Sequence, residues 1–378
     1  LIKINCLEFD CSENEIENYE IIYKNLGQTK NRLANVEFWN NSENSKNFQL
    51  LKNDYNDLKN YVFFEFKDEK IIIKKGNWSL EDQIIIPKDY KLIVEPGTKL
   101  SFTNKGQIVS FSPIFVEGLK EDPIIFKSNF DGNIDKYRKN SENKDYGFGI
   151  LVIKAQSKSI INNVIFDKLS APSISSNQST TGSINFYESD VEITNSKFLD
   201  NLRGDDYLNI IRSNFVLSNN TFENTNGDSV DIDFSKGIIK DSIFNKSLND
   251  AVDFSGSIVN LTNIKIIDAE DKAISAGEES EISISNMLIS NSKMGLVSKD
   301  NSKLFAQNVN IYESDIAISA YLKKSEYGPA FIEAKKITIE NSKLKYLKQK
   351  NSVISIDENL IPDFNCNQNK EACLTISQ

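Results

Sequence analysis

The chain has 378 residues, of which 39% are hydrophobic, and it carries a formal net charge of −10 and no histidine. The acidic balance and the lack of a Lys/Arg-rich run argue against a nucleic-acid partner, because backbone binding needs a basic surface. No apolar run approaches the roughly 18 residues of a membrane span, and without histidine every histidine-based triad, general base and metal site is excluded.

Residues 1–70 carry no repeat and are predicted to be an N-terminal cap or the tail of an upstream domain. Because the chain opens on Leu1 rather than Met, we also expect a leader or a whole domain before it. Two apolar rhythms in this segment predict short helices, which gives a partly helical cap. Their residues are Ile16, Tyr19, Ile22 and Tyr23, then Phe48, Leu50, Leu51, Tyr55 and Leu58.

The four cysteines stand only at the two ends of the chain. A four-thiolate zinc site usually takes two closely spaced C-x2-C pairs, and these gaps are too wide. Two local disulfides are the better interpretation, and they predict an extracellular, cell-surface or periplasmic location. The pairs are Cys6 with Cys11 and Cys366 with Cys373.

From Ile71 onwards short apolar strands alternate with Gly- and Pro-containing turns. From residue 189 a phrase recurs roughly every 22 to 24 residues: Ser, any residue, apolar, any residue, apolar, any residue, then Asn or Asp. A fixed period of this length without helical stretches predicts a β-solenoid. The serines are Ser189, Ser213, Ser235, Ser257, Ser280 and Ser302, and the closing residues are Asn195, Asn219, Asp241, Asn263, Asn286 and Asn308.

A second row stands four or five residues before each serine, and each member follows an apolar residue. Alternation with period two predicts that the apolar neighbours point inward and this row points outward. The row is Asn185, Asn209, Asp231, Asp253, Ser275, Ser298 and Ser319. The recurring serines are interpreted as structural, because they have no lysine partner at a fixed spacing and the chain has no histidine.

The solenoid is predicted over 71–357 and a C-terminal cap over 358–378. Three polar stretches interrupt the coils: Asn129–Asp145, Ser170–Thr181 and Lys323–Pro329. The first two are interpreted as loops that leave one side of the coils, where they either wall a groove or are inert surface.

This pattern resembles the right-handed parallel β-helix proteins of the pectate-lyase-like superfold. The stretch Leu92–Phe102 with the later strand Pro123–Phe126 is similar to the entry coil of bacterial surface β-helix proteins. Such β-helices accompany CotH-type kinase domains in some surface proteins, and this chain shows no kinase motif. The resemblance implies the fold, and it leaves the activity open because this fold hosts many functions.

Aspartates gather on the outward row in the middle of the repeat. Asp231 and Asp253 are equivalent on adjacent coils, Asp206, Asp228 and Asp250 form a parallel row, and Asp233 lies two residues beyond Asp231. Coils stack about 4.8 Å apart, so these carboxylates repel unless a raised pKa, a basic neighbour or a bound cation relieves them. The nearby basic residues are Arg203, Arg212 and Lys272.

The aspartates allow three interpretations. Asp231, Asp250 and Asp253 could be the acid and base of an enzyme acting on an acidic polysaccharide. A Ca²⁺ ion is the second option, since carboxylate oxygens suit it. In the third, each carboxylate is separately solvated at a solenoid corner and has no such role. The calcium ligands would be Asp228, Asp231, Asp250 and Asp253.

The phrase Asn249-Asp250 resembles a motif of polygalacturonase-like β-helices, but it lacks their glycine, and the chain lacks their histidine. Exposed aromatic rings beside the row could stack on sugars. The candidate substrate-binding residues are Asn209, Arg212, Tyr187, Tyr321 and Asp233.

The sequence therefore predicts an exported or cell-surface β-helix module that binds or organises polysaccharide without catalysis. One alternative is a lyase or glycoside hydrolase that uses the stacked aspartates. Another is an architectural rod or adhesin of a surface assembly, with a surface-assembly protein rather than a polysaccharide as its partner.

Overall fold

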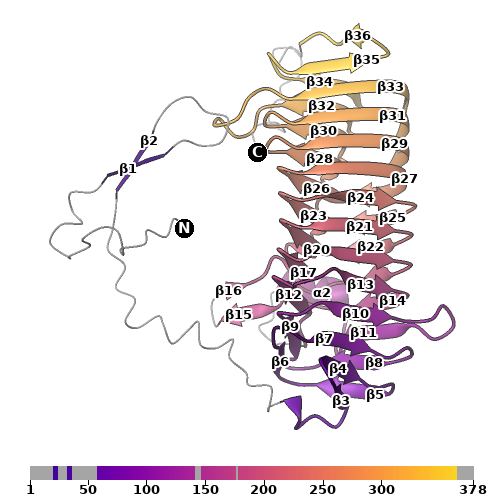
Figure 1. The fold of residues 1–378 in the computed structure, drawn as a ribbon. Helices are drawn as coiled ribbons and strands as arrows, with labels where there is room; N and C mark the ends of the chain where they lie inside the picture. Colours follow the sequence, from indigo (N-terminus) through magenta and orange to yellow (C-terminus); the bar gives the residue numbers. More distant parts are fainter. Residues whose placement is uncertain (1–19, 24–31, 36–57, 141–145, 176–177, 364–378) are drawn as a thin grey trace.

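The computed structural model describes residues 20–23, 32–35, 58–140, 146–175 and 178–363, and it shows a right-handed parallel β-helix of about 13 turns (Figure 1). This confirms the predicted fold class. A full turn lays strands on three faces in the order face 1, face 2, face 3, and each strand pairs in parallel with its equivalent on the next turn. In the described part of the chain, no helix is both long and apolar enough to cross a membrane.

Face 1 is a separate sheet of 11 strands. Its strands are β6 (Gln83–Ile86), β9 (Gln107–Ser110), β12 (Ile150–Ile153), β17 (Gly182–Tyr187), β20 (Asp206–Ile211), β23 (Asp228–Asp233), β26 (Val252–Ser255), β28 (Lys272–Gly277), β30 (Met294–Lys299), β32 (Ile316–Tyr321) and β34 (Leu344–Lys348).

Faces 2 and 3 belong to one continuous sheet. Face 2 holds β4 (Lys70–Ile73), β7 (Lys91–Val94), β10 (Ile114–Glu117), β13 (Ser159–Asn162), β18 (Val191–Thr194), β21 (Asn214–Ser218), β24 (Lys236–Lys240) and β35 (Val353–Ile356). Face 3 holds β5 (Asn77–Leu80), β8 (Lys99–Phe102), β11 (Ile124–Ser128), β14 (Val164–Asp167), β19 (Lys197–Leu199), β22 (Thr221–Thr225) and β25 (Ile243–Ser247). Four longer strands bend across both faces: β27 (Ile258–Ala269), β29 (Glu281–Ser290), β31 (Lys303–Tyr312) and β33 (Phe331–Glu340).

The interior is filled by the inward residues of all three faces, which form one continuous apolar core. Equivalent side chains stack along the axis because every turn presents the same position to the core. The clearest example is a column of phenylalanines on face 3, whose successive ring centroids lie 4.3 to 5.9 Å apart. Its members are Phe102, Phe126, Phe166, Phe198, Phe222 and Phe244.

The two recurrent polar positions form the corners of the coils. Each serine from Ser213 to Ser302 accepts the backbone N–H of the serine one turn before it, at 2.8 to 3.1 Å, which confirms the structural interpretation of this row. The closing residues from Asn195 to Asn308 have φ of 52° to 57°. Asparagine tolerates this left-handed conformation and can hydrogen-bond locally, which explains its recurrence.

The outward row is correct except at one coil. Strand pairing places Val297, and not Ser298, between Ser275 and Ser319. The prediction was wrong here because Val297 is an apolar residue on the outer side of face 1, where it is buried with Met294 and Tyr321. On this turn the inward Leu296 and the outward Val297 are both apolar, so the polar–apolar alternation is lost.

The insertions lie where they were predicted, and two of them contain regular structure. Asn129–Asp145 leaves the coil between β11 and β12 and includes α2 (Ile134–Asn140). Arg138 anchors this helix by donating from Nη2 to the backbone oxygens of Asn201 and Asn224, both at 2.7 Å. Ser170–Thr181 includes the antiparallel pair β15 (Ser173–Ser175) and β16 (Gln178–Ser179).

At the N-terminal side, the helix predicted through Ile22 and Tyr23 is wrong. These residues lie in β1 (Glu20–Tyr23), which pairs antiparallel with β2 (Arg32–Asn35), so this part of the apolar rhythm belongs to a strand. The solenoid's ends are closed by antiparallel strands, with β3 (Phe64–Lys67) on β4 and β36 (Asn359–Leu360) on β35. The division into 1–70, 71–357 and 358–378 stays a prediction.

Several predicted features lie outside the described residues. These are all but Leu58 of the second predicted N-terminal helix, Phe48 to Leu58, and both predicted disulfides, Cys6 with Cys11 and Cys366 with Cys373.

Candidate functional site

The predicted aspartates lie together on the outer side of face 1, on three adjacent strands. Strand pairing aligns Asp206 of β20 with Asp228 of β23, and Asp231 of β23 with Asp253 of β26. We call the following six residues the acidic cluster: Asp206, Asp228, Asp231, Asp233, Asp250 and Asp253.

The cluster is not the set of separately solvated carboxylates that one interpretation required. Asp206, Asp228 and Asp250 are 1%, 7% and 2% exposed, whereas Asp231, Asp233 and Asp253 are half-buried. One carboxylate oxygen from each of Asp228, Asp250 and Asp253 lies within 4.8 Å of the others. Carboxyl groups that are this close together and this shielded from water cannot all be ionised unless a positive charge lies beside them.

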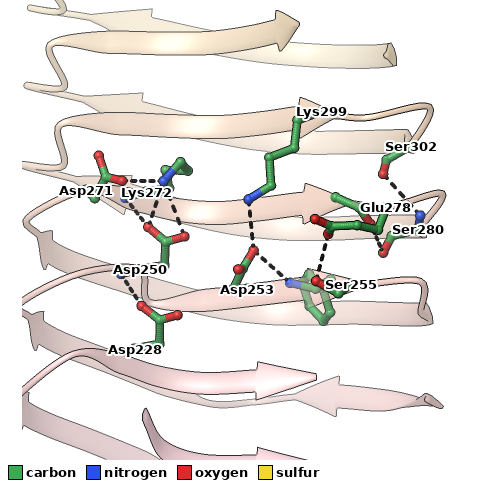
Figure 2. A network of polar contacts seen from close by, with 12 residues as sticks. Asp228, Asp250, Asp253, Ser255, Asp271, Lys272, Glu278, Ser280, Lys299 and Ser302 are labelled. Atoms are coloured by element: carbon green, nitrogen blue, oxygen red, sulfur yellow. Dashed lines mark hydrogen bonds and ion pairs between the residues drawn. The ribbon is translucent and has the colours of Figure 1, made fainter. Parts of the chain in front are cut away.

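Two lysines compensate part of the charge (Figure 2). Lys272 Nζ of β28 lies 3.3 Å from Asp250 Oδ1 and also contacts Asp271, while Lys299 Nζ of β30 lies 3.5 Å from Asp253 Oδ1. Burial alone would lower the pKa of each lysine, but the aspartates outweigh it and raise both pKa values. Both ammonium groups are therefore charged at neutral pH.

The remaining charge is relieved by protons. Burial raises the pKa of Asp228 from 3.8 to about 9 and that of Asp206 to about 7. Burial, with Asp206 beside it, also raises the pKa of Asp231 well above its usual value. The pKa of Asp250 rises only to about 6, because Lys272 opposes the effect of burial. The cluster thus contains neutral carboxylic acids next to lysine-paired carboxylates.

Hydrogen bonds hold the carboxyl groups in place. Asn249 Nδ2 and the backbone N–H of Asp250 donate to Asp228 Oδ1 at 2.7 and 2.8 Å. Asn209 Nδ2 donates to Asp231 Oδ2 at 3.0 Å. Asn209 is only 1% exposed, so its side chain positions Asp231, and a contact of Asn209 with substrate stays a prediction.

The other predicted contacts divide into two groups. Pairing confirms that Tyr187 and Asp233 share an outward column through Ile211, and Tyr187 and Arg212 border the cluster. Tyr321 shares this column through Lys299, but it is only 3% exposed and packs in an outer apolar cluster. Burial also raises its pKa. Its ring cannot serve as an exposed platform, and that prediction is wrong.

The basic neighbours were only partly predicted. Lys272 contacts the cluster as expected, whereas the Arg203 guanidinium lies over the Tyr137 ring and Arg212 lies near Glu188. Sequence reasoning missed Lys299, which follows Ser298 on β30, the strand where the predicted register slipped by one residue. Correct placement of Val297 in the outward row would have aligned Lys299 with Asp233, three coils further along the rod.

The calcium interpretation fits the residues only in part. Asp228, Asp250 and Asp253 could each offer one oxygen to a common ion, but Ca²⁺ takes 6 to 8 oxygen ligands. Lys272 and Lys299 already neutralise two of these three carboxylates, and Asp228 is protonated at neutral pH. A cation would have to displace both lysines and one proton.

The predicted groove walls have no counterpart in a pocket on the far side of the rod from face 1. An open pocket of about 500 Å³ lies at the bend between faces 2 and 3, on strands β27, β29, β31 and β33. Its lining includes Asn260, Ser283, Phe305 and Gln307, and no residue of Asn129–Asp145 or Ser170–Thr181.

No known protein family and no curated protein matches this sequence. Among solved structures, the catalytic domain of a GH87 alpha-1,3-glucanase has 13% identity and a TM-score of 0.44, over 76% of this chain and 63% of that domain. The periplasmic alginate epimerase AlgG has 11% identity and a TM-score of 0.39, over 80% of each chain. PfbA, a surface adhesin of Streptococcus pneumoniae, has 11% identity and a TM-score of 0.29, over 82% of this chain and 94% of that one.

The chain therefore spans less than two thirds of the length of the glucanase domain. Similarities at this level of identity describe the fold alone.

Proposed function

We propose that this β-helix binds a polysaccharide along face 1 and cleaves it by acid–base chemistry in the acidic cluster, as an exported or cell-surface protein. One observation carries the proposal: two half-buried carboxyl groups pair on adjacent coils at the outer side of face 1, and their surroundings differ. Burial raises the pKa of Asp231 well above its usual value, whereas Lys299 Nζ lies 3.5 Å from Oδ1 of its pairing partner Asp253. Such a pair is the usual basis for assigning an acid and a base.

The roles follow from position. Asp231 and Asp253 are half-buried, so a ligand outside face 1 meets them before the deeper Asp228 and Asp250. Paired strands lie about 4.8 Å apart, close to the roughly 5 to 5.5 Å between the carboxyl groups of retaining glycosidases. Asp231 would protonate the departing glycosidic oxygen. Asp253 would act as the nucleophile of a hydrolase or the proton-abstracting base of a lyase.

A second candidate is glycan binding without cleavage, bridged by a cation or by hydrogen bonds alone. The proximity of the three carboxylate oxygens favours it, and the two lysines disfavour the cation. An architectural rod is the third candidate, in which the cluster is a buried polar network and nothing more.

The test is a depolymerisation assay on neutral and uronate polysaccharides, with new reducing ends and unsaturated uronates as readouts. Asp231→Asn and Asp253→Asn should each lower kcat by about 10²-fold or more. Both changes are nearly isosteric, and asparagine already occupies the Asp231 column at Asn185 and Asn209.

Asp241→Asn is the matched control. Asp241 is exposed, has φ of 52° and lies in its corner column between Asn219 and Asn263, so the change removes one carboxylate without touching face 1. Binding without turnover in the wild-type protein would replace catalysis by the second candidate. If the wild-type protein shows neither binding nor turnover, the architectural rod is the candidate that remains.

A further inference from the structure

The corner between face 1 and face 2 contains Phe234, a residue that is unfavourable at this position of the solenoid. The residue after each of seven successive face-1 strands is left-handed, with φ of 48° to 61°. Most charged members of this column form ion pairs: Glu188 lies 3.5 Å from Lys154 and 3.7 Å from Arg212, and Glu278 contacts Lys324. Asp300 accepts the backbone N–H groups of Lys323 and Lys324 instead. The column is Lys154, Glu188, Arg212, Phe234, Gly256, Glu278 and Asp300.

Phe234 is unfavourable at this position in two ways. It has φ of 49°, a conformation that costs a bulky side chain more than glycine or asparagine. It is also 56% exposed, so its ring gains little from burial. Strain that is kept at an exposed residue is a reason to look for a function there.

The neighbouring turns make room for the ring and support it. A Cβ at Gly256, on the next turn, would lie 2.6 Å from Phe234 Cδ1, so the ring lies over the bare backbone of this glycine. On the turn before, the Arg212 guanidinium lies 5.9 Å from the centroids of both the Phe234 and Tyr187 rings. Arg212 Nη1 also donates to the Tyr187 hydroxyl at 2.9 Å.

Arg212 and Phe234 of this corner, with the Tyr187 ring of the adjoining strand column beside Arg212, therefore form one group across three turns, which we call the aromatic column. It borders the acidic cluster directly, because Phe234 follows Asp233 in the chain and Asp231 precedes it by three residues. The Arg212 side chain is 54% exposed. Its guanidinium carries five N–H donors, and Tyr187 takes only one of them.

We propose that the aromatic column is a subsite for an acidic polysaccharide, in which a pyranose ring stacks on Phe234 and a uronate carboxylate binds Arg212. An exposed aromatic face suits the apolar face of a sugar, and a guanidinium suits a carboxylate in a bidentate geometry. The proposal rests on the proposed function, since it supplies the substrate class for the acidic cluster. The glycan would run along the rod axis past Asp231 and Asp253.

The experiment measures binding by calorimetry to the full chain. The probes are oligogalacturonate, alginate oligosaccharides and a neutral malto-oligosaccharide of the same length. At least one uronate probe should bind. Phe234→Ala should weaken its affinity by about tenfold or more, which corresponds to about 1.4 kcal/mol. Arg212→Gln should weaken the affinity for the uronate probe and leave any affinity for the neutral probe unchanged.

Leu119→Ala is the matched control, because Leu119 is also 56% exposed and lies far from face 1 in the turn between β10 and β11. Phe234→Asn separates binding from folding. Asparagine is favoured at a left-handed corner, so this variant should lose affinity while its melting temperature does not fall.

Three results would overturn the subsite: no binding of either uronate, unchanged affinity in Phe234→Ala, or a melting temperature that drops in Phe234→Asn because the ring is structural. Loss of self-association in Phe234→Ala, with glycan affinity unchanged, would assign the ring to a protein contact instead.

If Phe234→Ala loses affinity but no variant shows turnover, the subsite stands and catalysis fails. If turnover persists in Phe234→Ala with unchanged KM, catalysis stands and the subsite fails.

Discussion

Lys272 and Asp250 form a buried ion pair that sets the charge balance of the acidic cluster. Their side chains are 9% and 3% exposed, and Asp250 Oδ1 also accepts the backbone N–H of Lys272 at 2.9 Å. A buried pair of this kind adds little net stability, but breaking it leaves one charge without a partner. The pair is therefore a sensitive point of the fold whatever the cluster does.

Replacement of the lysine tests this at neutral pH. Lys272→Met should lower the free energy of unfolding by about 3 to 5 kcal/mol, because Asp250 would then be buried beside other carboxyl groups with no cation. Adding Asp250→Asn should recover most of the loss. Lys158→Met, which breaks the exposed Lys158–Glu192 pair, should change stability by less than about 1 kcal/mol. Urea unfolding measures all four proteins, and equal losses in the two single variants would contradict the argument.

At the scale of the strand and its corner, the serine row joins consecutive turns. Ser257 Oγ accepts the backbone N–H of Ser235 at 3.0 Å, and it lies 3.0 Å from the backbone oxygen of Ser255, to which its hydroxyl can donate. Both serines are buried, so a lost partner cannot be replaced by bulk water. The row thus satisfies backbone groups that the change of direction between faces removes from the sheets.

Removal of one hydroxyl should have a local and measurable cost. Ser257→Ala leaves the Ser235 N–H unsatisfied and should lower the free energy of unfolding by about 1 to 3 kcal/mol. Ser157→Ala is the control, because Ser157 is exposed and its change should stay within about 0.5 kcal/mol. Hydrogen exchange at the Ser235 amide should also accelerate in Ser257→Ala. An amide as protected as in the wild-type protein would show that the hydroxyl is dispensable.

The elements were predictable where one turn repeats the next. The serine corner, the asparagine corner and the pairing of Asp231 with Asp253 all follow from the period. The register failed at Ser298 because the outer side of face 1 is apolar on that turn, and alternation cannot distinguish an outer apolar cluster from the core. The burial of Tyr321 was hidden for the same reason, since its neighbours Met294 and Val297 come from another turn.

The site was predictable as a set of residues but not as an electrostatic state. The stacking of coils predicted that the aspartates lie close together. Their burial and the contact of Lys299 with Asp253 could be seen only in the structure. Phe234 carries no sequence signal of its own. It becomes unusual only when its positive φ, its exposure and the gap at Gly256 are known together.

At the scale of the whole rod, the outer side of face 1 changes character along the axis. Its first turns carry an apolar cluster around Ile85, Val109 and Leu151, and its last turns carry another around Val297 and Leu347. The acidic cluster lies between them on β20, β23 and β26 (Figure 1). The burial of Asp206, Asp228 and Asp250 keeps water from these carboxyl groups and raises their pKa values.

This arrangement makes the stability of the rod depend on pH. The folded pKa values of Asp250, Asp206 and Asp228 are about 6, 7 and 9, all above the unfolded value of 3.8. Between pH 3.8 and about pH 9 the folded chain therefore binds more protons than the unfolded chain, so the free energy of unfolding falls as the pH rises. Lys272 outweighs burial and lowers the pKa of Asp271, whose contribution has the opposite sign and is lost only as the pH falls towards and below 3.8.

The melting temperature should therefore be highest near pH 5 and should fall steadily up to pH 9. Asp228→Asn should flatten the decline above about pH 7, because asparagine keeps an oxygen for the donors Asn249 and Asp250 without a charge to bury. Asp241→Asn should follow the wild-type curve. A melting temperature that rises from pH 5 to 8 would mean that the cluster is ionised in the folded rod. Asp231 could then not act as the acid, and the proposed acid–base chemistry would fail with it.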